Sequence, residues 1–425
     1  MRRNVFVLGL DELNLSTLLR LADADHYDFH QLLTRHELQT GTVSVPELLT
    51  KARHQLDSFD GSIDAIVGYW DFPVSMMVPI LCDRYGLRSA DLEAILKCEH
   101  KYWSRLEQQK VIDECVPFGL IDLAEENPGL PATLSYPVWI KPIKSTASEG
   151  ALYVENEEQL PEALVEERLV IDRIGRPFSD ILAMVELPAE IAAVGELACL
   201  VEEAATGKQV TVEGFSRGGR VEIYGVVDSV SYPGVSSFLR YQYPSRRVPA
   251  LVQEHMGEVS RRVITALGLR NSTFNIEYFW DPVTTRIRLL EINARHSQSH
   301  ARLFELVDGV PNHAYMLDLA LDRDPRRVEP GQGAFPTAAK WFLRRFSDGL
   351  VRRVPTPEEV AEIERSISGV TIRVTVRAGA RLSEHDGEDS YSYVLAEAYT
   401  GAQDEQELQD KYARCVEALN FTIDD

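Results

Sequence analysis

Two strand-like segments on either side of residue 283 constrain the fold more than any other feature of this sequence. Residues 274–280 (FNIEYFW) and 286–293 (RIRLLEIN) are apolar runs rich in aromatic and β-branched side chains, and an Asp-Pro turn signal lies between them. Such a pair predicts two adjacent strands joined by a short turn. Glu277 and Glu291 would then lie side by side.

The two glutamates are predicted to bind a metal ion. A strand glutamate more often faces solvent, but an unpaired carboxylate in these apolar surroundings would be costly to bury, so a cation partner is the better explanation. Asn293 falls on the same strand face as Glu291 and adds a third oxygen. Two carboxylates and an amide oxygen suit magnesium, which keeps its other positions for water or phosphate oxygens.

Three basic residues could meet phosphate near this site. Arg295 faces the same way as Asn293 if the strand continues, and its guanidinium could stabilise a transferring phosphoryl group. Lys141 ends the buried strand-like run 136–142 and could bind the α and β phosphates, although its head could instead reach water. Lys144 in the next loop is a weaker candidate because loop lysines are often solvated.

The remaining pattern predicts an α/β protein of three parts. Residues 1–100 read as a doubly wound α/β domain, 101–205 as a linker helix with a central phosphate-binding subdomain, and 206–425 as an antiparallel-sheet domain with a mixed α+β tail. The expected strands are 4–9, 62–69, 136–142, 151–156, 196–203, a hairpin over 210–230 turning at Gly218-Gly219, and 369–376. The expected helices are 12–23, 45–58, 75–85, 92–115, 249–267 and 404–419. The lone Gly9 is not a dinucleotide fingerprint, so no NAD site is expected.

Composition argues against several classes of protein. A chain of 425 residues exceeds one ordinary core, and a formal charge of -22 argues against general affinity for nucleic acid or anionic lipid. Five dispersed cysteines without a Cys-x-x-Cys pair imply neither a disulfide framework nor a zinc knuckle, which fits a reducing cytoplasm. The most apolar region, 181–201, is broken by acidic residues, so no membrane span is expected, and the N-terminus shows no export signal.

Four stretches together resemble the successive motifs of the ATP-grasp superfamily. They are YPVWIKP (136–142), KSTASEG (144–150), LVEEAATGKQVTVEGF (200–215) and EINAR (291–295), and the likeness runs over about 99–321. The resemblance implies the ATP-grasp fold, with an N-terminal doubly wound domain, a central lid-like α+β subdomain and a C-terminal antiparallel-sheet domain that holds the metal.

The resemblance also assigns individual residues. Lys101 and Lys141 match the two ATP lysines, with Lys144 beside them. Ser148, Glu149 and Gly150 match the loop that closes over the phosphates. Glu202, Glu203 and Ala205 lie in the hinge that hydrogen-bonds adenine. Glu277, Glu291 and Asn293 match the magnesium ligands, and Arg295 matches the arginine that contacts phosphate and substrate.

Two departures from the family pattern bear on ATP binding. Gln209 stands where many relatives have a ribose-binding glutamate, so this position carries no charge. The phosphate loop has Gly150 alone where relatives often have several glycines, which implies a stiffer closure.

The segment after Arg295 is a candidate lining for the acceptor pocket. His296, Ser297, Ser299 and His300 supply polar groups there, Ser297 or Ser299 could instead cap the next helix, and Glu213 is a further lining candidate. His296 and His300 have the spacing of a zinc pair, but no third ligand is evident. Residues 69–71 (Tyr-Trp-Asp) could also line the pocket or belong to the core.

The resemblance implies a ligase that forms carbon–nitrogen bonds with ATP and Mg²⁺ (or Mn²⁺), releasing ADP and phosphate. The carboxylate would be activated as an acyl phosphate and joined to an amine, with amino acids as the expected substrates and a homodimer as the expected assembly. Two alternatives stay open: a biotin-carboxylase-like enzyme that activates bicarbonate, and a nucleotide-binding regulator without catalysis.

Overall fold

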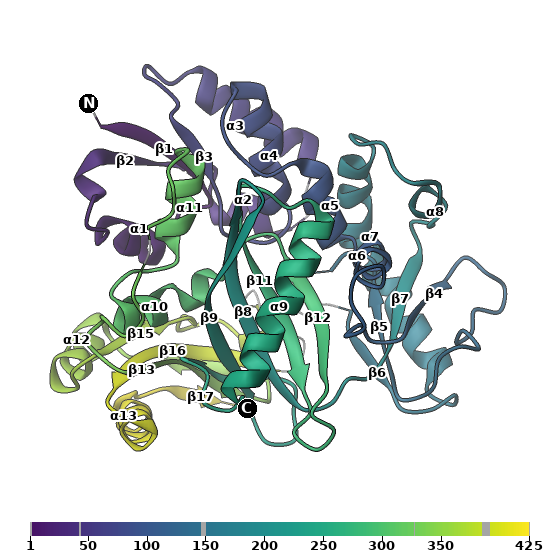
Figure 1. Ribbon diagram of the computed structural model, residues 1–425. Coiled ribbons are helices and arrows are strands. Elements are labelled where there is room, and N and C mark those ends of the chain that lie inside the picture. The colour runs from purple at the N-terminus through teal and green to yellow at the C-terminus, as the bar shows by residue number, and fades with distance from the viewer. Residues whose placement is uncertain (1, 42–43, 146–149, 327, 385–391, 425) are drawn as a thin grey trace.

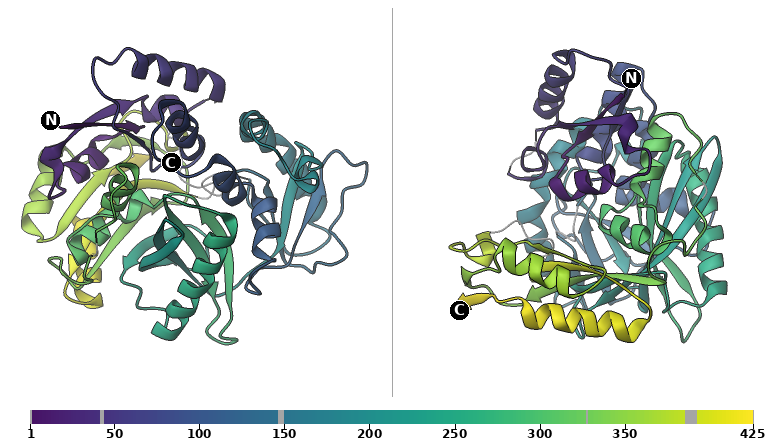
Figure 2. Two further views of the ribbon diagram at one scale, coloured as in Figure 1. Left: turned by 45° about the horizontal axis from the view of Figure 1, so that its top comes forward. Right: turned by 90° about the vertical axis from the view of Figure 1, so that its left-hand side faces the viewer.

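The computed structural model describes residues 2–41, 44–145, 150–326, 328–384 and 392–424. Its strands form a three-stranded, a four-stranded, an eight-stranded and a two-stranded sheet. Figure 1 shows the three-stranded sheet at the top left, the four-stranded sheet at the right and the C-terminal elements below. The left view of Figure 2 shows the four-stranded sheet and its helix set apart from the rest.

The N-terminal part is a parallel sheet in the order β2-β1-β3, as the alternating apolar and amphipathic segments predict. Its strands are β1 (Arg3–Leu8), β2 (Tyr27–Leu32) and β3 (Ala65–Val67), and its helices are α1 (Glu12–Leu19), η1 (Ala24–His26), α2 (Arg35–Gln39), α3 (Val45–Asp57) and α4 (Val74–Tyr85). The sequence did not reveal β2, because its residues YDFHQL mix polar and apolar side chains and only Tyr27 and Leu32 at its two ends are buried.

The connection to the next part corrects one prediction. In place of one helix over 92–115, the chain forms α5 (Leu92–Glu99) and α6 (Lys101–Gln108) with a break at His100. His100 has extended backbone angles, and its Nδ1 accepts a hydrogen bond from the Trp103 N–H at 3.1 Å, so it caps the second helix. The break makes Lys101 the first residue of α6.

The central part is an antiparallel sheet in the order β4-β7-β5-β6, with one long helix packed on β5 and β6. Its elements are β4 (Phe118–Asp122), β5 (Val138–Pro142), β6 (Leu152–Val154), α7 (Leu160–Leu182), α8 (Ala189–Ala192) and β7 (Ala198–Glu203). The helix α7 was not predicted, because Gly175 and Pro177 within it are residues that usually end a helix.

The eight-stranded antiparallel sheet forms the largest part, in the order β12-β11-β8-β9-β10-β13-β16-β15. Its strands are β8 (Lys208–Arg217), β9 (Arg220–Ser231), β10 (Phe238–Tyr243), β11 (Ser272–Trp280), β12 (Ile287–Asn293), β13 (Thr337–Arg345), β15 (Val370–Val374) and β16 (Tyr393–Ala402). The other elements are α9 (Ala250–Leu267), η2 (Gln298–His300), α10 (Ala301–Asp308), α11 (His313–Ala320), β14 (Leu350–Arg353), α12 (Pro357–Ser366), η3 (Leu382–Glu384), α13 (Glu405–Ala418) and β17 (Thr422–Asp424).

The two faces of this sheet differ in polarity at its β12-β11-β8 end. Alternate residues of β8 and β11 are fully buried and apolar, among them Val210, Val212, Ile276 and Tyr278, and α9 covers this side in Figure 1. Because strand side chains alternate, the intervening residues all point to the opposite face. That face carries the polar residues of the candidate site.

Candidate active site

Polar side chains form two rows across the β12-β11-β8 end of the sheet. Glu291, Glu277 and Thr211 lie opposite one another on the three strands, and Asn293, Asn275 and Glu213 form the next row. The register thus brings the two predicted metal-binding glutamates together as a direct cross-strand pair.

The acid pair has one cationic and one neutral partner. Lys101 Nζ contacts Glu291 Oε1 at 2.5 Å, and Gln209 Nε2 donates to Glu277 Oε2 at 2.8 Å. Burial raises the pKa of Glu277 to about 7, and the charge of Glu291 adds to the rise. Burial also acts to raise the pKa of Glu291, but the charge and hydrogen bond of Lys101, together with the charge of Lys144, outweigh it, and the net shift is downward. Like charges placed directly opposite each other repel, so a further cation would be well placed here.

Asn293 is oriented to offer an oxygen. Its Nδ2 donates to Asn275 Oδ1 at 3.0 Å, and Asn275 Nδ2 donates to the Arg295 carbonyl at 2.9 Å. Asn293 Oδ1 accepts no hydrogen bond from the residues that the structure describes, and Asn293 lines the pocket described below. Two carboxylates and this amide oxygen fit a hard divalent cation such as Mg²⁺ or Mn²⁺.

Arg295 is held by an acid from the N-terminal part. Its Nη2 lies 3.0 Å from Asp71 Oδ2, just beyond the end of β12. Asp71 also lies 3.4 Å from Lys144 Nζ, and Lys144 pairs with the buried Glu99. Lys144 is therefore not solvated, contrary to the usual behaviour of loop lysines. Burial raises the pKa of Asp71 while Lys144 and Arg295 lower it more strongly, so Asp71 stays ionised.

Lys141 belongs to a second ion cluster. Its Nζ lies 2.9 Å from Glu202 Oε2, and Glu202 also pairs with the buried Arg105. Burial acts to raise the pKa of Glu202, but Arg105 and Lys141 bring it down to about 2. The Glu202 side chain thus fixes the lysine and the end of β7.

The predicted hinge follows β7. The Glu203 N–H already donates to the Pro117 carbonyl, and the Ala204 N–H donates to the Pro137 carbonyl. The Ala205 N–H donates to no group within the described ranges, and Ala205 and Glu203 both line the pocket. A base in this position could therefore hydrogen-bond the Ala205 N–H, whereas the Glu203 N–H is already used.

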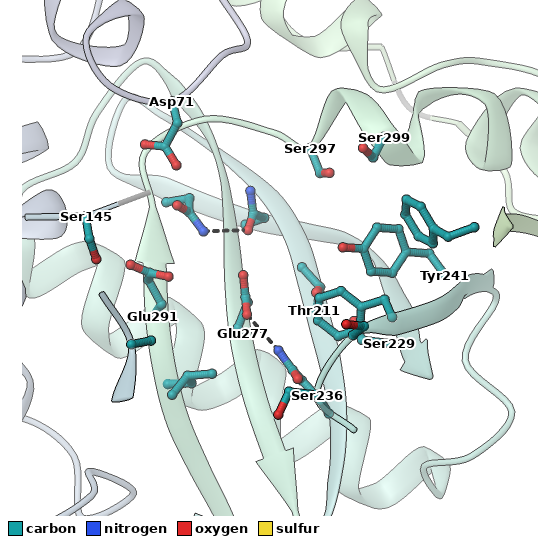
Figure 3. A pocket seen from close by; sticks show the side chains of 18 of the residues that line it. Asp71, Ser145, Thr211, Ser229, Ser236, Tyr241, Glu277, Glu291, Ser297 and Ser299 are labelled. Atoms are coloured by element: carbon teal, nitrogen blue, oxygen red, sulfur yellow. Dashed lines mark hydrogen bonds between the residues drawn. The ribbon is translucent and has the colours of Figure 1, made fainter. Parts of the chain in front are cut away.

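These clusters surround one cavity of about 1430 Å³. Figure 3 shows Glu277 at its centre, Glu291 and Ser145 on one side, and Thr211, Ser229, Tyr241 and Ser299 on the other, with Asp71 above. Residues of all three parts of the chain line it. They include Trp70 and Asp71, Lys101 and Arg105, Lys141 and Ser145, Glu202, Gln209, Arg295, Ser297, His300 and Arg377.

The segment 295–300 divides between the lining and the layer behind it. Ser297, Ser299 and His300 line the cavity, whereas Glu213 and His296 are fully buried, outside the lining, and bond to other protein groups. The predicted place of Glu213 and His296 in the lining is thus corrected to a supporting position. Neither Ser297 nor His300 caps a helix with its side chain. Among the described residues, no group of three His, Cys, Asp or Glu side chains is placed to hold a metal ion.

Comparison with known proteins agrees with this architecture. A family model described as the ATP-grasp domain matches residues 134–301. The chain carries an ATP-grasp domain. The superfamily and fold predicted from the four sequence motifs are therefore confirmed.

Solved structures of similar fold extend the comparison beyond the ATP-grasp domain. An L-amino acid ligase from Bacillus licheniformis superposes with a TM-score of 0.73 at 14% identity, covering 100% of this chain and 99% of that chain. Biotin carboxylase from Campylobacter jejuni gives 0.68 at 13% identity, covering 100% and 93%. These identities establish a shared fold only.

A curated relative matches part of the chain. The carbamoyl phosphate synthase large chain of Thermotoga neapolitana is 24% identical over 226 residues, which is 52% of this chain and 18% of that protein. The chain therefore spans less than a fifth of the length of this relative. No helix among the described residues has the length and apolar character needed to cross a membrane.

Several residues of the candidate site escaped the sequence prediction. Glu99 and Arg105 lie in what read as one connecting helix, and Asp71 appeared only as a possible lining residue. Asp71 is a charged side chain in an otherwise apolar and aromatic stretch, GYWDFPV, which is a signal that could have drawn attention to it. Glu99 and Arg105 lie among other charged residues, in LKCEHKYWSRLEQQK, so no local signal marks them. Ser148 and Glu149 lie outside the described residues, while Gly150 is described and has a φ of +66°.

Proposed function

We propose that this chain is an ATP-dependent ligase that activates a carboxylate as an acyl phosphate and joins it to an amine. The observation that carries the proposal is the acid pair Glu277 and Glu291, which meets Lys101 and lies near Arg295 within a large cavity. The overall similarity to an L-amino acid ligase supports amino acids as the substrates.

The chemistry transfers the γ-phosphoryl group of ATP to a carboxylate oxygen, which gives an acyl phosphate and ADP. An amine nitrogen then attacks the carbonyl carbon, the bond to the phosphate oxygen breaks, and an amide and phosphate are released. Magnesium or manganese, bound by Glu277, Glu291 and Asn293, would neutralise phosphate charge.

The chain's own residues bind and orient the reactants. Lys101 and Lys141 would contact the nucleotide phosphates, and their ammonium groups pair with Glu291 and Glu202. Arg295, held by Asp71, can stabilise negative charge on the transferring group and on the acyl phosphate. Adenine would lie against the hinge, where the Ala205 N–H can donate to it.

A screen of amino acid pairs tests the proposal directly. We expect ADP release to require both a carboxylate and an amine substrate. Mass measurement should show a product whose mass is that of the two substrates joined with the loss of water. Chelation of divalent cations should abolish release, and Mg²⁺ or Mn²⁺ should restore it. Release that depends instead on bicarbonate would favour the carboxylase alternative, and nucleotide binding without any release would favour a regulator.

Replacement of Glu291 tests the acid pair. Glu291→Gln keeps the shape of the side chain but removes its charge, so we expect ADP release to fall at least about a hundredfold. The control is Glu222→Gln, at a half-buried position on β9 whose side chain pairs with Arg220 and lies outside the cavity lining. Equal activity of the two variants would contradict the assigned role of the acid pair.

A further inference from the structure

A buried carboxylate and a histidine form a pair beside the acceptor end of the cavity. Glu213 Oε1 lies 2.8 Å from His300 Nδ1, and both residues are almost completely buried. The same carboxylate accepts the Ser297 N–H at 3.1 Å and the Tyr224 hydroxyl at 2.7 Å. Asn312 Nδ2 donates to the Ser297 carbonyl at 2.8 Å, so the turn that carries His300 is held from both sides.

The second ring nitrogen of His300 is available to a ligand. With Nδ1 committed to Glu213, His300 Nε2 has no hydrogen-bond partner among the residues that the structure describes, although only 2% of the residue is exposed. His300 lines the cavity, and its ring packs edge-on against Tyr241 at 4.9 Å between centroids. A buried imidazole with one fixed and one unfilled nitrogen can exchange a proton with a bound molecule.

The position of this pair relative to the acid pair follows from the strand register. Thr211 lies directly opposite Glu277, and Glu213 is two residues further along β8 on the same face, a step of about 7 Å. Figure 3 shows Ser297 and Ser299, the neighbours of His300 in sequence, on the side of the cavity away from Glu291. A substrate activated near Arg295 could therefore meet a second substrate held near His300.

The charges around His300 come from several elements. Glu213 of β8 faces its Nδ1, Tyr224 of β9 and Tyr241 of β10 lie beside the pair, and His296 lies on the same turn. Lys340 of β13 donates to Ser299 Oγ at 3.0 Å and is paired with Glu397, while Arg295 is paired with Asp71. Glu213 is thus the carboxylate in direct contact with the imidazole, and it can balance an imidazolium charge.

From this geometry we infer that His300, oriented by Glu213, is the base that deprotonates the amine substrate, an inference that rests on the proposed ligase function. The amine arrives as an ammonium ion, and His300 Nε2 takes one of its protons. The neutral nitrogen forms a bond to the acyl carbonyl carbon with its lone pair, and phosphate leaves with the electrons of the broken carbon–oxygen bond. The remaining surplus proton on nitrogen passes to phosphate or solvent, and the imidazolium returns its proton to solvent.

Hydroxylamine separates this step from the activation of the carboxylate. It is largely uncharged at neutral pH, so it traps an acyl phosphate as a hydroxamate without first losing a proton to a base. We expect His300→Gln to reduce amide formation with the amino acid pair found in the screen about a hundredfold, and to change hydroxamate formation by less than about threefold. Glu213→Gln should reduce amide formation less, by about tenfold, and should likewise leave hydroxamate formation nearly unchanged.

The pH dependence distinguishes a base from a residue that only shapes the pocket. As the pH rises toward the pKa of the amine substrate, a growing fraction of the substrate loses its proton without help from the protein. The rate of amide formation by the wild type, divided by the rate of the His300→Gln variant, should therefore fall toward one. A packing defect would leave that ratio constant. His255→Gln is the matched control, because His255 also pairs with a glutamate, Glu114 at 3.0 Å, but lies on α9 outside the cavity lining.

Each outcome bears on the inference. Equal loss of hydroxamate and amide formation in His300→Gln, or no loss of either, would overturn it. If His300→Gln does not fold in a thermal melt, Glu213→Gln decides by the same comparison. If the wild-type chain forms no hydroxamate with any carboxylate, the ligase proposal itself fails, and the role of His300 fails with it.

Discussion

Glu167 on α7 is a fully buried carboxyl group whose two oxygens have no hydrogen-bond partner in the described part of the chain. Burial raises its pKa to about 8, and the neighbouring charge of Glu166 adds to the effect. The folded protein therefore holds a proton on Glu167 in a pH range where the unfolded chain, with an ordinary carboxyl pKa of 4.5, has lost it. By linkage, this residue lowers the free energy of unfolding as the pH rises from about 4.5 to about 8.

Glu167→Gln should remove this pH dependence, because glutamine has the shape of the protonated acid and does not ionise. We expect the free energy of unfolding of the variant, relative to that of the wild type, to be about 2–3 kcal/mol higher at pH 8.5 than at pH 5.5. Urea unfolding at the two pH values measures this change. Glu162→Gln, at an exposed position of the same helix, is the control and should show no such gain. If the difference in free energy of unfolding between Glu167→Gln and the wild type is the same at both pH values, the raised pKa assigned to Glu167 is contradicted.

At the residue scale, the sequence located site residues better than it located their contacts. Gln209 was predicted to stand at the ribose-binding position, and its amide donates to Glu277, a bond that a glutamate could make only when protonated. Lys144 was predicted as a weaker phosphate-binding candidate because loop lysines are often solvated, and in the structure Asp71 and Glu99 hold it. These contacts join residues that lie 45, 68 and 73 positions apart in the sequence, so no local pattern predicts them.

At the scale of elements, β8 and β9 approach closely where their register shifts, between Glu213 and Gly214. A methyl group on Gly214 would lie 2.4 Å from the ring of Phe274 and 2.5 Å from the Glu222 carbonyl oxygen. The backbone oxygen cannot move without disturbing the sheet. The bulge thus requires a glycine beside the carboxylate that holds His300.

Gly214→Ala should therefore destabilise the protein by about 1–3 kcal/mol, the usual cost of forcing added volume into a packed region. Thermal unfolding measures the effect. Gly129→Ala is the matched control, since an added methyl there meets no atom within 4 Å, and it should leave the melting temperature nearly unchanged. A Gly214→Ala variant as stable as this control would show that the strands can separate at the bulge without cost.

Elements built from local contacts were the ones that the sequence predicted. The hairpins β8-β9 and β11-β12 have recognisable turns and alternate in polarity, so both were predicted with nearly correct bounds. Strands β10, β13 and β16 were missed. β10 follows β9 across a turn at Pro233-Gly234, but its residues FLRYQY mix polar and apolar side chains, and β13 pairs with β10 about a hundred residues away. The break at His100 was missed for a different reason: a histidine cap does not interrupt the apolar pattern of α5 and α6.

At the scale of the whole molecule, one carboxylate joins the three parts of the chain. Asp71 follows β3 of the N-terminal sheet, Lys144 follows β5 of the central sheet, and Arg295 follows β12 of the eight-stranded sheet. The sequence predicted three parts but could not predict this junction, because the three residues are brought together only by the assembled fold. The boundaries proposed at residues 100 and 205 stay predictions.

Asp71→Asn tests whether this junction stabilises the assembled chain. Asparagine keeps the size of the side chain but leaves Lys144 and Arg295 with Glu99 as the nearby acid. We expect the free energy of unfolding to fall by about 3–5 kcal/mol, which is typical for breaking a buried ion pair. We also expect ADP release to fall, because Arg295 loses the carboxylate that holds it. Urea unfolding at neutral pH measures the first effect. Asp322→Asn is the control, because Asp322 is an exposed carboxylate of the C-terminal part that pairs with Arg88 of the N-terminal part. This variant should lower the free energy of unfolding by less than about 1 kcal/mol. If the two variants lose equal stability, burial of the junction contributes nothing, and the parts must be held together by their apolar contacts alone.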